Sequence, residues 1–548
     1  MSWLLYRKAR IHKMPRRNLS FILIFLLSTW LPFEGISQTK HWIYFTDKPT
    51  KELKLSISPK ALLKRIEEGR ILDEKDYEVS PAYLQTLSQQ GVQISRTSRW
   101  LNAATAVLSP TQITELQQLP FVDKIVPVNR FSRPASITEG CDTITDLDSY
   151  TRQLSMIGLD KLHESGFTGK GVTIAVFDNG FNRVDQMEGF SHIFREGRMI
   201  ATRDFVDGDD DVYEDCFSSG ACRHGTHVLS TIAGVVENEF MGAAPDANFI
   251  LLRTEDDASE TSQEEDNWVA AAEYADSLGA DIFSTSLGYL TYDGNIGSYS
   301  AGDLDGNTAA ITLAGDIASE KGIIVVNSAG NRGANGLMAP SDGKMIISVG
   351  AVDKCRSYAT FSSVGPTADG RLKPDISAMG QRVFTLSTDG SIGLRSGTSF
   401  SCPILSGFAA CLLEASPQAS RNQIYQAIIE SGDEEPNYFT GHGVPNGPQA
   451  LQWLRNFVEV SDGMVVFPNP SSTQVNVSFN NPESEKNYSL NILNINGQRV
   501  FRQNGLLSQG VNLIPVRHNL PEGIYFLQII PTDAKNQLYT RTFIVTNT

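Results

Sequence analysis

Basic residues are a minority in this sequence. The 548 residues include 46 Lys and Arg against 62 Asp and Glu, so the formal net charge is −16. A general nucleic-acid binder needs a basic surface to meet the phosphates, and this balance argues against such a partner. Hydrophobic residues make up 41% and charged residues 20% of the chain, which excludes a wholly disordered or collagen-like protein. The length predicts about three or four domains.

Long apolar runs are also rare, and the most apolar one extends from Leu19 to Leu31. It is too short to cross a bilayer comfortably, where about 20 residues are needed. Small residues at Gly35 and Ser37 favour cleavage before Gln38. We therefore predict a signal peptide over residues 1–37 and secretion, with a membrane anchor as the alternative. The basic residues that precede the run are Arg7, Lys8, Arg10, Lys13, Arg16 and Arg17.

Cysteine is scarce, with six residues in all. Export permits disulfides, and Cys216 and Cys222 lie close together in a polar loop, so we predict that they pair. Cys402 and Cys411 lie on one expected helix, about 13 Å apart along its axis, which is too far to bridge. They are expected to be buried thiols. Whether Cys141 and Cys355 form a disulfide is left undecided.

Three kinds of sequence pattern follow the signal peptide. Residues 38–134 alternate strand-like and helical segments, which predicts a small α+β unit. Residues 135–150 are polar and without periodicity, as is typical of a linker exposed to cleavage. Residues 463–548 contain short strands separated by NP, NG, QG and PEG turns, which predicts a small antiparallel β-sandwich.

The middle segment, residues 151–457, is of the α/β type. Continuous apolar runs such as VTIAVF, NFILLR and GIIVVNSAG alternate with helical stretches, which predicts a parallel β-sheet flanked by helices. Such folds place their sites in loops at the carboxyl ends of the strands. Most of the acidity is here, because residues 135–462 contain 47 acidic and 20 basic residues.

Three residues of the middle segment could form one catalytic group. Asp178 ends a buried strand, His224 stands just before a helix, and Ser399 opens an apolar helix after Gly397. Taken singly, Asp178 could be an ordinary acid at the end of a strand, and Ser399 could be a helix cap. His224 could bind a metal with His227, although HxxH alone is a weak metal motif. Taken together they supply what serine catalysis needs, since the hydroxyl requires a base and that base requires an orienting acid.

The surrounding motifs carry a resemblance to a known family. DNG at Asp178, HGTHV at His224 and GTSFSCP at Ser399 match the three signatures of subtilisin-like serine endopeptidases, and SLG, VNSAGNRG and FSSVGPTADGRLKPDISAMG add to the match. The resemblance covers about residues 151–457. It implies that Ser399 is the nucleophile, His224 the general base and then acid, and Asp178 the orienting carboxylate. Asn331 would donate its side-chain amide to the oxyanion, and no cofactor would be required.

The same resemblance suggests how peptide substrates bind. Ser286, Leu287 and Gly288 would form an edge on which a protein or peptide substrate pairs as an added strand. Arg332, next to Asn331, would reach the pocket for the residue before the scissile bond and favour acidic or polar side chains there.

The flanking units resemble parts of exported zymogens. Residues 38–134, especially WLNAATAVLSPTQITELQQLPFVDKIVPV, resemble the inhibitory propeptide of these enzymes and carry 14 basic and 10 acidic residues. The resemblance implies that the propeptide inhibits its own enzyme and that the chain cuts itself between Arg133 and Tyr150. Residues 463–548, with FPNP, NGQRV and GIYFLQI, resemble the C-terminal sorting domain of type IX secretion substrates, which engages the secretion machinery. The final TFIVTNT lacks the basic pair often seen near the end of such domains.

An acidic run in the middle segment raises the question of a structural metal. Asp207, Asp209 and Asp211 are clustered as calcium ligands can be, although their spacing is not that of an EF-hand and a solvated acidic loop is the alternative. Two other functions also stay open: a catalytically inactive subtilisin-like scaffold for binding, and an adhesin whose active part is the C-terminal sandwich.

Overall fold

A computed structural model of the chain describes most residues from 39 onward. The described residues are 39–49, 53–67, 72–127, 130–131, 150–214, 222–256, 260–261, 263–290, 298–461, 464–467, 471, 474–481, 485–508, 510–531 and 539–546. The predicted signal peptide, the linker up to residue 149, Cys141 and Cys216 lie outside this set.

The N-terminal unit is built on a four-stranded antiparallel sheet with the order β2-β3-β1-β4. Its core contains Ile43, Leu87, Ala104 and Leu108. Ser109 caps helix α3 in a capping box with Gln112, which explains why the helix starts directly after strand β3. The elements are β1 Thr39–Phe45, α1 Pro59–Glu67, the 3₁₀ turn η2 Glu74–Asp76, α2 Pro81–Gln89, β2 Ile94–Ser98, β3 Ala103–Leu108, α3 Pro110–Leu116, β4 Val122–Pro127 and β5 Arg130–Phe131.

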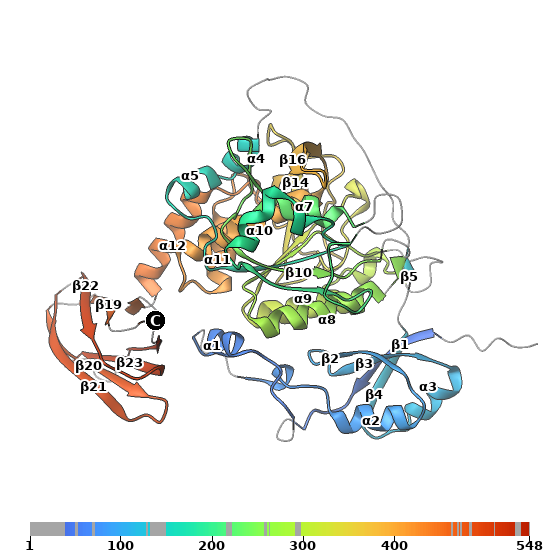
Figure 1. The fold of residues 1–548 in the computed structure, drawn as a ribbon, viewed down its shortest axis with the longest axis horizontal. Coiled ribbons are helices and arrows are strands. Elements are labelled where there is room, and N and C mark those ends of the chain that lie inside the picture. Colours follow the sequence, from blue (N-terminus) through green and yellow to red (C-terminus); the bar gives the residue numbers. More distant parts are fainter. Residues whose placement is uncertain are drawn as a thin grey trace, which may run out of the picture. The chain divides into compact units, whose positions relative to one another are not determined.

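The middle domain has a seven-stranded parallel sheet with the order β15-β14-β13-β12-β6-β10-β7. Helices α8 and α9 cover one face of this sheet, and α7 and α10 cover the other (Figure 1). The side chains of β6 alternate between the two faces of the sheet. Ile174 and Val176 pack toward α7 and α10, whereas Ala175 and Phe177 pack toward α8 and α9. The predicted parallel α/β fold is confirmed.

The bounds of the main elements in the middle domain are as follows. The strands are β6 Thr173–Asp178, β7 Met199–Asp204, β10 Asn248–Arg253, β12 Ile282–Thr285, β13 Ile324–Ser328, β14 Ile347–Val352 and β15 Ile376–Met379, with the short β11 Glu260–Thr261 paired to β5. The helices are α4 Tyr150–Ser155, α5 Leu159–Glu164, α6 Ser191–Arg195, α7 His224–Ala233, α8 Gln263–Leu278, α9 Ala310–Glu320, α10 Thr398–Ala415, α11 Arg421–Glu430 and α12 Gly447–Ser461.

Helix α10 is long and apolar enough to cross a membrane by length and composition. Its residues from Thr398 to Leu412 are all buried among the other elements of the domain, which marks it as a core helix. Cys402 and Cys411 lie on it as buried thiols, as predicted. Burial raises the pKa of the Cys402 thiol to about 12, so it stays protonated.

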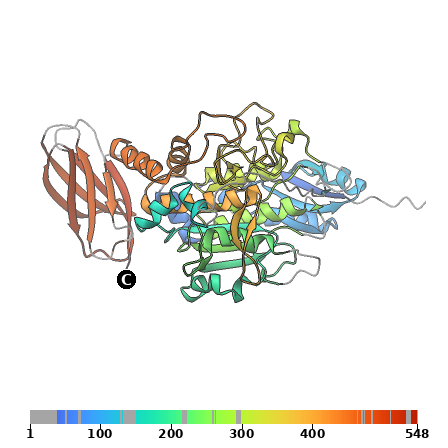
Figure 2. The same cartoon turned by 90° about the horizontal axis from the view of Figure 1, so that it is seen from above.

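The C-terminal unit is an antiparallel β-sandwich, again as predicted (Figure 2). One sheet has the order β18-β19-β22 and the other β21-β20-β23-β24, and the core between them includes Val475, Leu490, Leu527 and Phe543. The strands are β18 Met464–Phe467, β19 Gln474–Asn481, β20 Lys486–Asn494, β21 Arg499–Leu507, β22 Gly510–Arg517, β23 Gly523–Pro531 and β24 Tyr539–Val545.

Candidate active site

Asp178 lies at the carboxyl end of β6, between neighbouring strands β10 and β12. Every residue of β6 is buried, and the strand ends where the backbone turns at Gly180, which has a φ of 139°. The Asp178 side chain is fully buried, and its Oδ1 accepts a hydrogen bond from the Asn179 backbone N–H at 2.8 Å. A buried carboxylate held in this way is prepared for a charged or hydrogen-bonding partner.

His224 supplies that partner from the first turn of α7. Its Nδ1 lies 2.8 Å from Asp178 Oδ1. The approach depends on Gly225, because a Cβ there would lie 2.3 Å from the Gly180 carbonyl oxygen and 2.9 Å from Asp178 Cβ. With Nδ1 occupied by the carboxylate, Nε2 of the same ring is left for another group.

His227, one turn further along α7, has a different environment. It is buried, and desolvation together with the nearby Arg395 lowers its pKa to about 3, so it is neutral at physiological pH. Within the described ranges, no group of three or more His, Cys, Asp or Glu side chains could hold a metal ion. The alternative of a His224–His227 metal pair therefore gains no support from these residues.

Ser399 is the second residue of α10, after Gly397 and Thr398. The ring of the next residue, Phe400, has its centroid 6.0 Å from that of His224, so the start of α10 lies next to the start of α7. Ser286 donates its hydroxyl to the Ser399 carbonyl oxygen at 2.9 Å. This contact ties the end of β12 to the first turn of α10.

Asn331 is held beside the same helix start by a residue that the sequence reasoning missed. Its Oδ1 accepts hydrogen bonds from the Thr398 backbone N–H at 2.8 Å and from the Thr398 hydroxyl at 3.0 Å. Because both donors hold the oxygen, the amide Nδ2 is the end left to donate elsewhere. A Cβ on Gly397 would lie 3.4 Å from that Nδ2. The sequence did offer a signal for this role, because Thr398 is a small hydrogen-bonding residue directly before Ser399.

The predicted substrate edge lies at the end of β12. The Leu287 carbonyl oxygen accepts hydrogen bonds from Asn327 Nδ2 and Ser328 Oγ, each at 3.3 Å, which holds Ser286 to Gly288 in place. Arg332 is anchored through its backbone N–H, which donates to Ser363 Oγ at 3.1 Å, and partial burial lowers the pKa of its guanidinium. The role of Arg332 in substrate choice stays a prediction.

Several carboxylates of the acidic run have partners within the protein. Arg253 Nη1 lies 2.5 Å from both Asp204 Oδ2 and Asp207 Oδ2, so a guanidinium already neutralises this end of the loop. Asp209 and Asp211 accept backbone hydrogen bonds within the loop, from Asp211 N and Tyr213 N respectively. Among the described residues, no group of three or more His, Cys, Asp or Glu side chains is placed to hold a metal ion, and calcium binding by Asp207, Asp209 and Asp211 stays a prediction.

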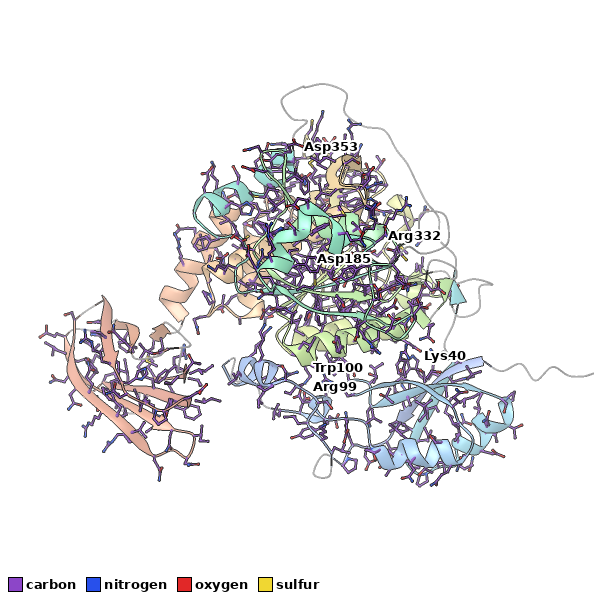
Figure 3. The ribbon with its side chains drawn as sticks, viewed as in Figure 1. Lys40, Arg99, Trp100, Asp185, Arg332 and Asp353 are labelled. Carbon is purple, nitrogen blue, oxygen red and sulfur yellow. The ribbon has the colours of Figure 1, made fainter. Side chains whose placement is uncertain are left out.

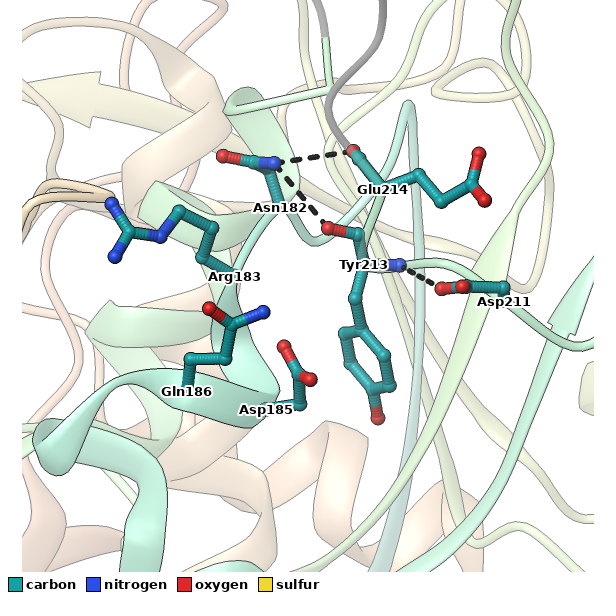
Figure 4. Close-up of a pocket in the computed structure, with 7 residues that line it drawn as sticks. All are labelled: Asn182, Arg183, Asp185, Gln186, Asp211, Tyr213 and Glu214. Atoms are coloured by element: carbon teal, nitrogen blue, oxygen red, sulfur yellow. Dashed lines mark hydrogen bonds between the residues drawn. The ribbon is translucent and has the colours of Figure 1, made fainter.

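A small polar pocket lies beside this loop (Figure 4). It has a volume of about 290 Å³. At its lining, Asn182 Nδ2 donates hydrogen bonds to the carbonyl oxygens of Tyr213 and Glu214. None of Asp178, His224 and Ser399 lines it, so it is separate from the candidate active site. The lining residues are Asn182, Arg183, Asp185, Gln186, Asp211, Tyr213 and Glu214.

Cys222, two residues before His224, is disulfide-bonded. Its predicted partner Cys216 lies outside the described residues, so the Cys216–Cys222 pairing stays a prediction.

The family of the chain follows from comparison with known proteins. Residues 169–444, just over half of the chain, match the model of the subtilase family. The chain belongs to the subtilase family. It is accordingly a serine endopeptidase. Residues 40–139 of the subtilase match the peptidase S8 propeptide domain of Bacteroidota, and residues 465–546 match the secretion system C-terminal sorting domain. The enzyme is thus a secreted or cell-surface protein made with a propeptide.

Individual relatives of this subtilase are moderately similar. Subtilisin NAT of Bacillus subtilis subsp. natto is 28% identical over 373 residues, which cover 67% of this chain and 85% of that protein. Serine protease AprX of Bacillus subtilis (strain 168) is 29% identical over 322 residues, covering 52% of this chain and 67% of that protein. Among solved structures, MycP1 with its N-terminal propeptide removed is 22% identical, covers 55% of this chain and 96% of its own, and has a TM-score of 0.44.

Proposed function

We propose that this subtilase hydrolyses peptide bonds through an acyl-enzyme on Ser399. The observation that carries the proposal is the 2.8 Å contact between His224 Nδ1 and Asp178 Oδ1 at the carboxyl edge of the sheet, beside the start of α10. The buried carboxylate selects the tautomer with the proton on Nδ1, which leaves Nε2 basic. His224 then takes the Ser399 proton as Oγ attacks the peptide carbonyl.

The remaining steps return every proton. The tetrahedral intermediate carries its charge on the former carbonyl oxygen, where Asn331 Nδ2 and the Ser399 backbone N–H donate hydrogen bonds. When the C–N bond breaks, His224 gives its proton to the leaving amine. Water then attacks the ester with His224 as base, and the acid product leaves with Ser399 restored. None of these steps requires a cofactor, and calcium has no part in them.

Substrate binding is proposed along Ser286, Leu287 and Gly288, where an extended peptide adds a strand. Arg332 then favours a glutamate or another polar side chain before the scissile bond. Comparing peptides with Glu and Lys at that position tests this role. Arg332→Ala should abolish the preference for Glu, and a preference unchanged in the variant would remove the proposal.

We also propose that the enzyme is a self-processed zymogen, with a signal peptide at 1–37, propeptide at 38–134, linker at 135–150, catalytic domain at 151–457 and sorting domain at 463–548. Support comes from strand β5, where Arg130 and Phe131 pair antiparallel with Thr261 and Glu260 of the catalytic domain. The chain is thereby held as an added strand directly before the linker, which favours cutting between Arg133 and Tyr150.

Labelling with a serine-directed fluorophosphonate tests the proposed nucleophile. The full chain should be labelled and should cleave peptides, whereas Ser399→Ala should lose both properties and stay uncut in the linker. Ser396→Ala, at an exposed hydroxyl three residues earlier, is the matched control and should behave as wild type. Labelling that persists in Ser399→Ala would disprove the assignment. A folded wild type that is neither labelled nor active would favour the inactive scaffold.

A further inference from the structure

Two elements of the propeptide, helix α1 and the turn η2, lie outside its hydrophobic core. They stand between β1 and α2 along the chain. None of the buried residues in the core cluster of the propeptide comes from α1 or η2. The polar groups of α1 and η2 instead contact the catalytic domain at the C-terminal ends of α8 and α9.

Helix α1 caps the C-terminal end of α8. The Ser58 N–H donates to the Ser277 carbonyl oxygen at 2.8 Å, and Lys64 Nζ donates to the Ala280 carbonyl oxygen at 3.3 Å. The aliphatic part of Lys60 packs directly against Gly279, where an added Cβ would lie 2.8 Å from Lys60 Cγ. Carbonyl groups at a helix C-terminus carry partial negative charge and lack hydrogen-bond donors within the helix. A basic helix placed there supplies both positive charge and donors.

A buried network of six charged side chains lies beside this cap. Asp76 of η2, which is fully buried, lies 2.9 Å from Arg65 of α1 and 2.8 Å from Lys321 at the end of α9. Asp276 of α8 joins the network through Arg65 at 3.0 Å and Arg99 at 2.6 Å.

Arg99, next to Trp100 on the turn after β2 (Figure 3), connects the network to the propeptide core. Its guanidinium Nε lies 3.9 Å from the carboxylate of Glu273, the sixth member. Trp100 is itself buried in the hydrophobic cluster of the catalytic domain that includes α8.

The buried charges of the network balance only when both partners are present, and the half-exposed Asp73 of the propeptide adds a further anion 2.9 Å from Lys321. The propeptide contributes two cations, Arg65 and Arg99, and one anion, Asp76, while the enzyme contributes the cation Lys321 and two anions, Glu273 and Asp276. A buried charge that loses its partner is strongly unfavourable, because the desolvation cost remains without the attraction that offset it. Partial separation of the two domains is therefore opposed until water can reach all six groups.

We propose that α1, η2 and Arg99 form a charge lock that determines how long the cleaved propeptide stays bound to the enzyme. The proposal rests on the zymogen function proposed above. The lock is distinct from the catalytic residues, because the described partners of Asp76, Arg65 and Lys321 include none of Asp178, His224, Ser399 or Asn331. Weakening it should consequently change the time of release and leave cutting of the linker unchanged.

The test follows two events separately in the full chain. Gel electrophoresis reports cutting of the linker, and hydrolysis of a chromogenic peptide reports release of the propeptide. Asp76→Asn and Lys321→Met should each shorten the interval between the two events by at least about tenfold. Lys75→Ala is the matched control, since Lys75 lies in the same turn but pairs with the exposed Glu320, and it should change the interval less than about twofold.

Combining the variants tests direct contact. Asp76 and Lys321 pair with each other, but Asp76 also pairs with Arg65 and Lys321 with Asp73. The double variant should therefore shorten the interval by less than the product of the two single effects. Additive effects, an unchanged interval in both single variants, or an equal effect of Lys75→Ala would each overturn the lock. If Asp76→Asn fails to fold and is not cut, the proposal is tested with Lys321→Met alone. The final peptide-hydrolysing activity of that variant shows whether its enzyme is folded. A wild type that never becomes active would instead refute the proposed function.

Discussion

Thr398 holds the side chain of Asn331, the proposed oxyanion donor. Its N–H and hydroxyl both bind Asn331 Oδ1, at 2.8 and 3.0 Å, so the hydroxyl contributes one of two restraints on the amide. We expect Thr398→Val to lower kcat by about tenfold with KM nearly unchanged, less than the roughly 10²–10³-fold loss when an oxyanion donor is itself removed. Steady-state kinetics on one peptide checks this, and Thr398→Ser should restore kcat. A raised KM with normal kcat would contradict the positioning role.

Helix α7 must lie against the loop after β6 for His224 to reach Asp178. An alanine at 225 would place its Cβ 2.3 Å from the Gly180 carbonyl oxygen, so Gly225→Ala must displace the helix. We expect kcat/KM to fall by at least about a hundredfold, because displacements near 1 Å disrupt catalytic geometry. The far-UV circular dichroism should be retained. Gly393→Ala is the control, since its Cβ would meet nothing closer than Ser387 Oγ at 3.6 Å. Equal activity in the two variants would contradict this packing argument.

The C-terminal sandwich and the catalytic domain have separate hydrophobic cores. The cluster of the sandwich contains residues from Met464 to Val545, and the two clusters of the catalytic domain contain none of these. Deleting residues 463–548 should therefore leave kcat/KM of the purified enzyme unchanged while its export fails, because the sorting domain is lost. Activity assays and immunoblots of cells and medium measure the two effects. Normal export of the truncated chain would contradict this division, and lost hydrolysis would favour the sandwich as the functional part.

Much of the fold was predictable because its signals are local. The apolar run ending at Asp178 becomes a fully buried strand, and Ser58 precedes a helix over Pro59–Glu67. The turn-rich C-terminal strands form the expected sandwich. Periodicity and turn residues act over a few positions, so they can be recognised without knowing what packs against them.

The ion-pair partner of Asp207 could not be predicted from the sequence, because charge pairing is not local. Asp207 appeared to be one of several adjacent carboxylates, yet its partner is Arg253, 46 residues later on the neighbouring strand β10. A cluster of acids in the sequence does not reveal which cation the fold brings to it. Lys321 illustrates the same point, since it contacts Asp76, 245 residues earlier, only because the catalytic domain and the propeptide meet there.

The order of residues along the chain was sufficient to determine the alternation of strands and helices, the C-terminal sorting domain and the types of residue available for chemistry. Folding alone decided which of them meet: His224 with Asp178, Thr398 with Asn331, and Ser286 with Ser399. The reason is that local conformation depends on neighbouring residues, whereas a hydrogen bond of 3 Å between residues 46 to 113 positions apart depends on how whole strands and helices pack.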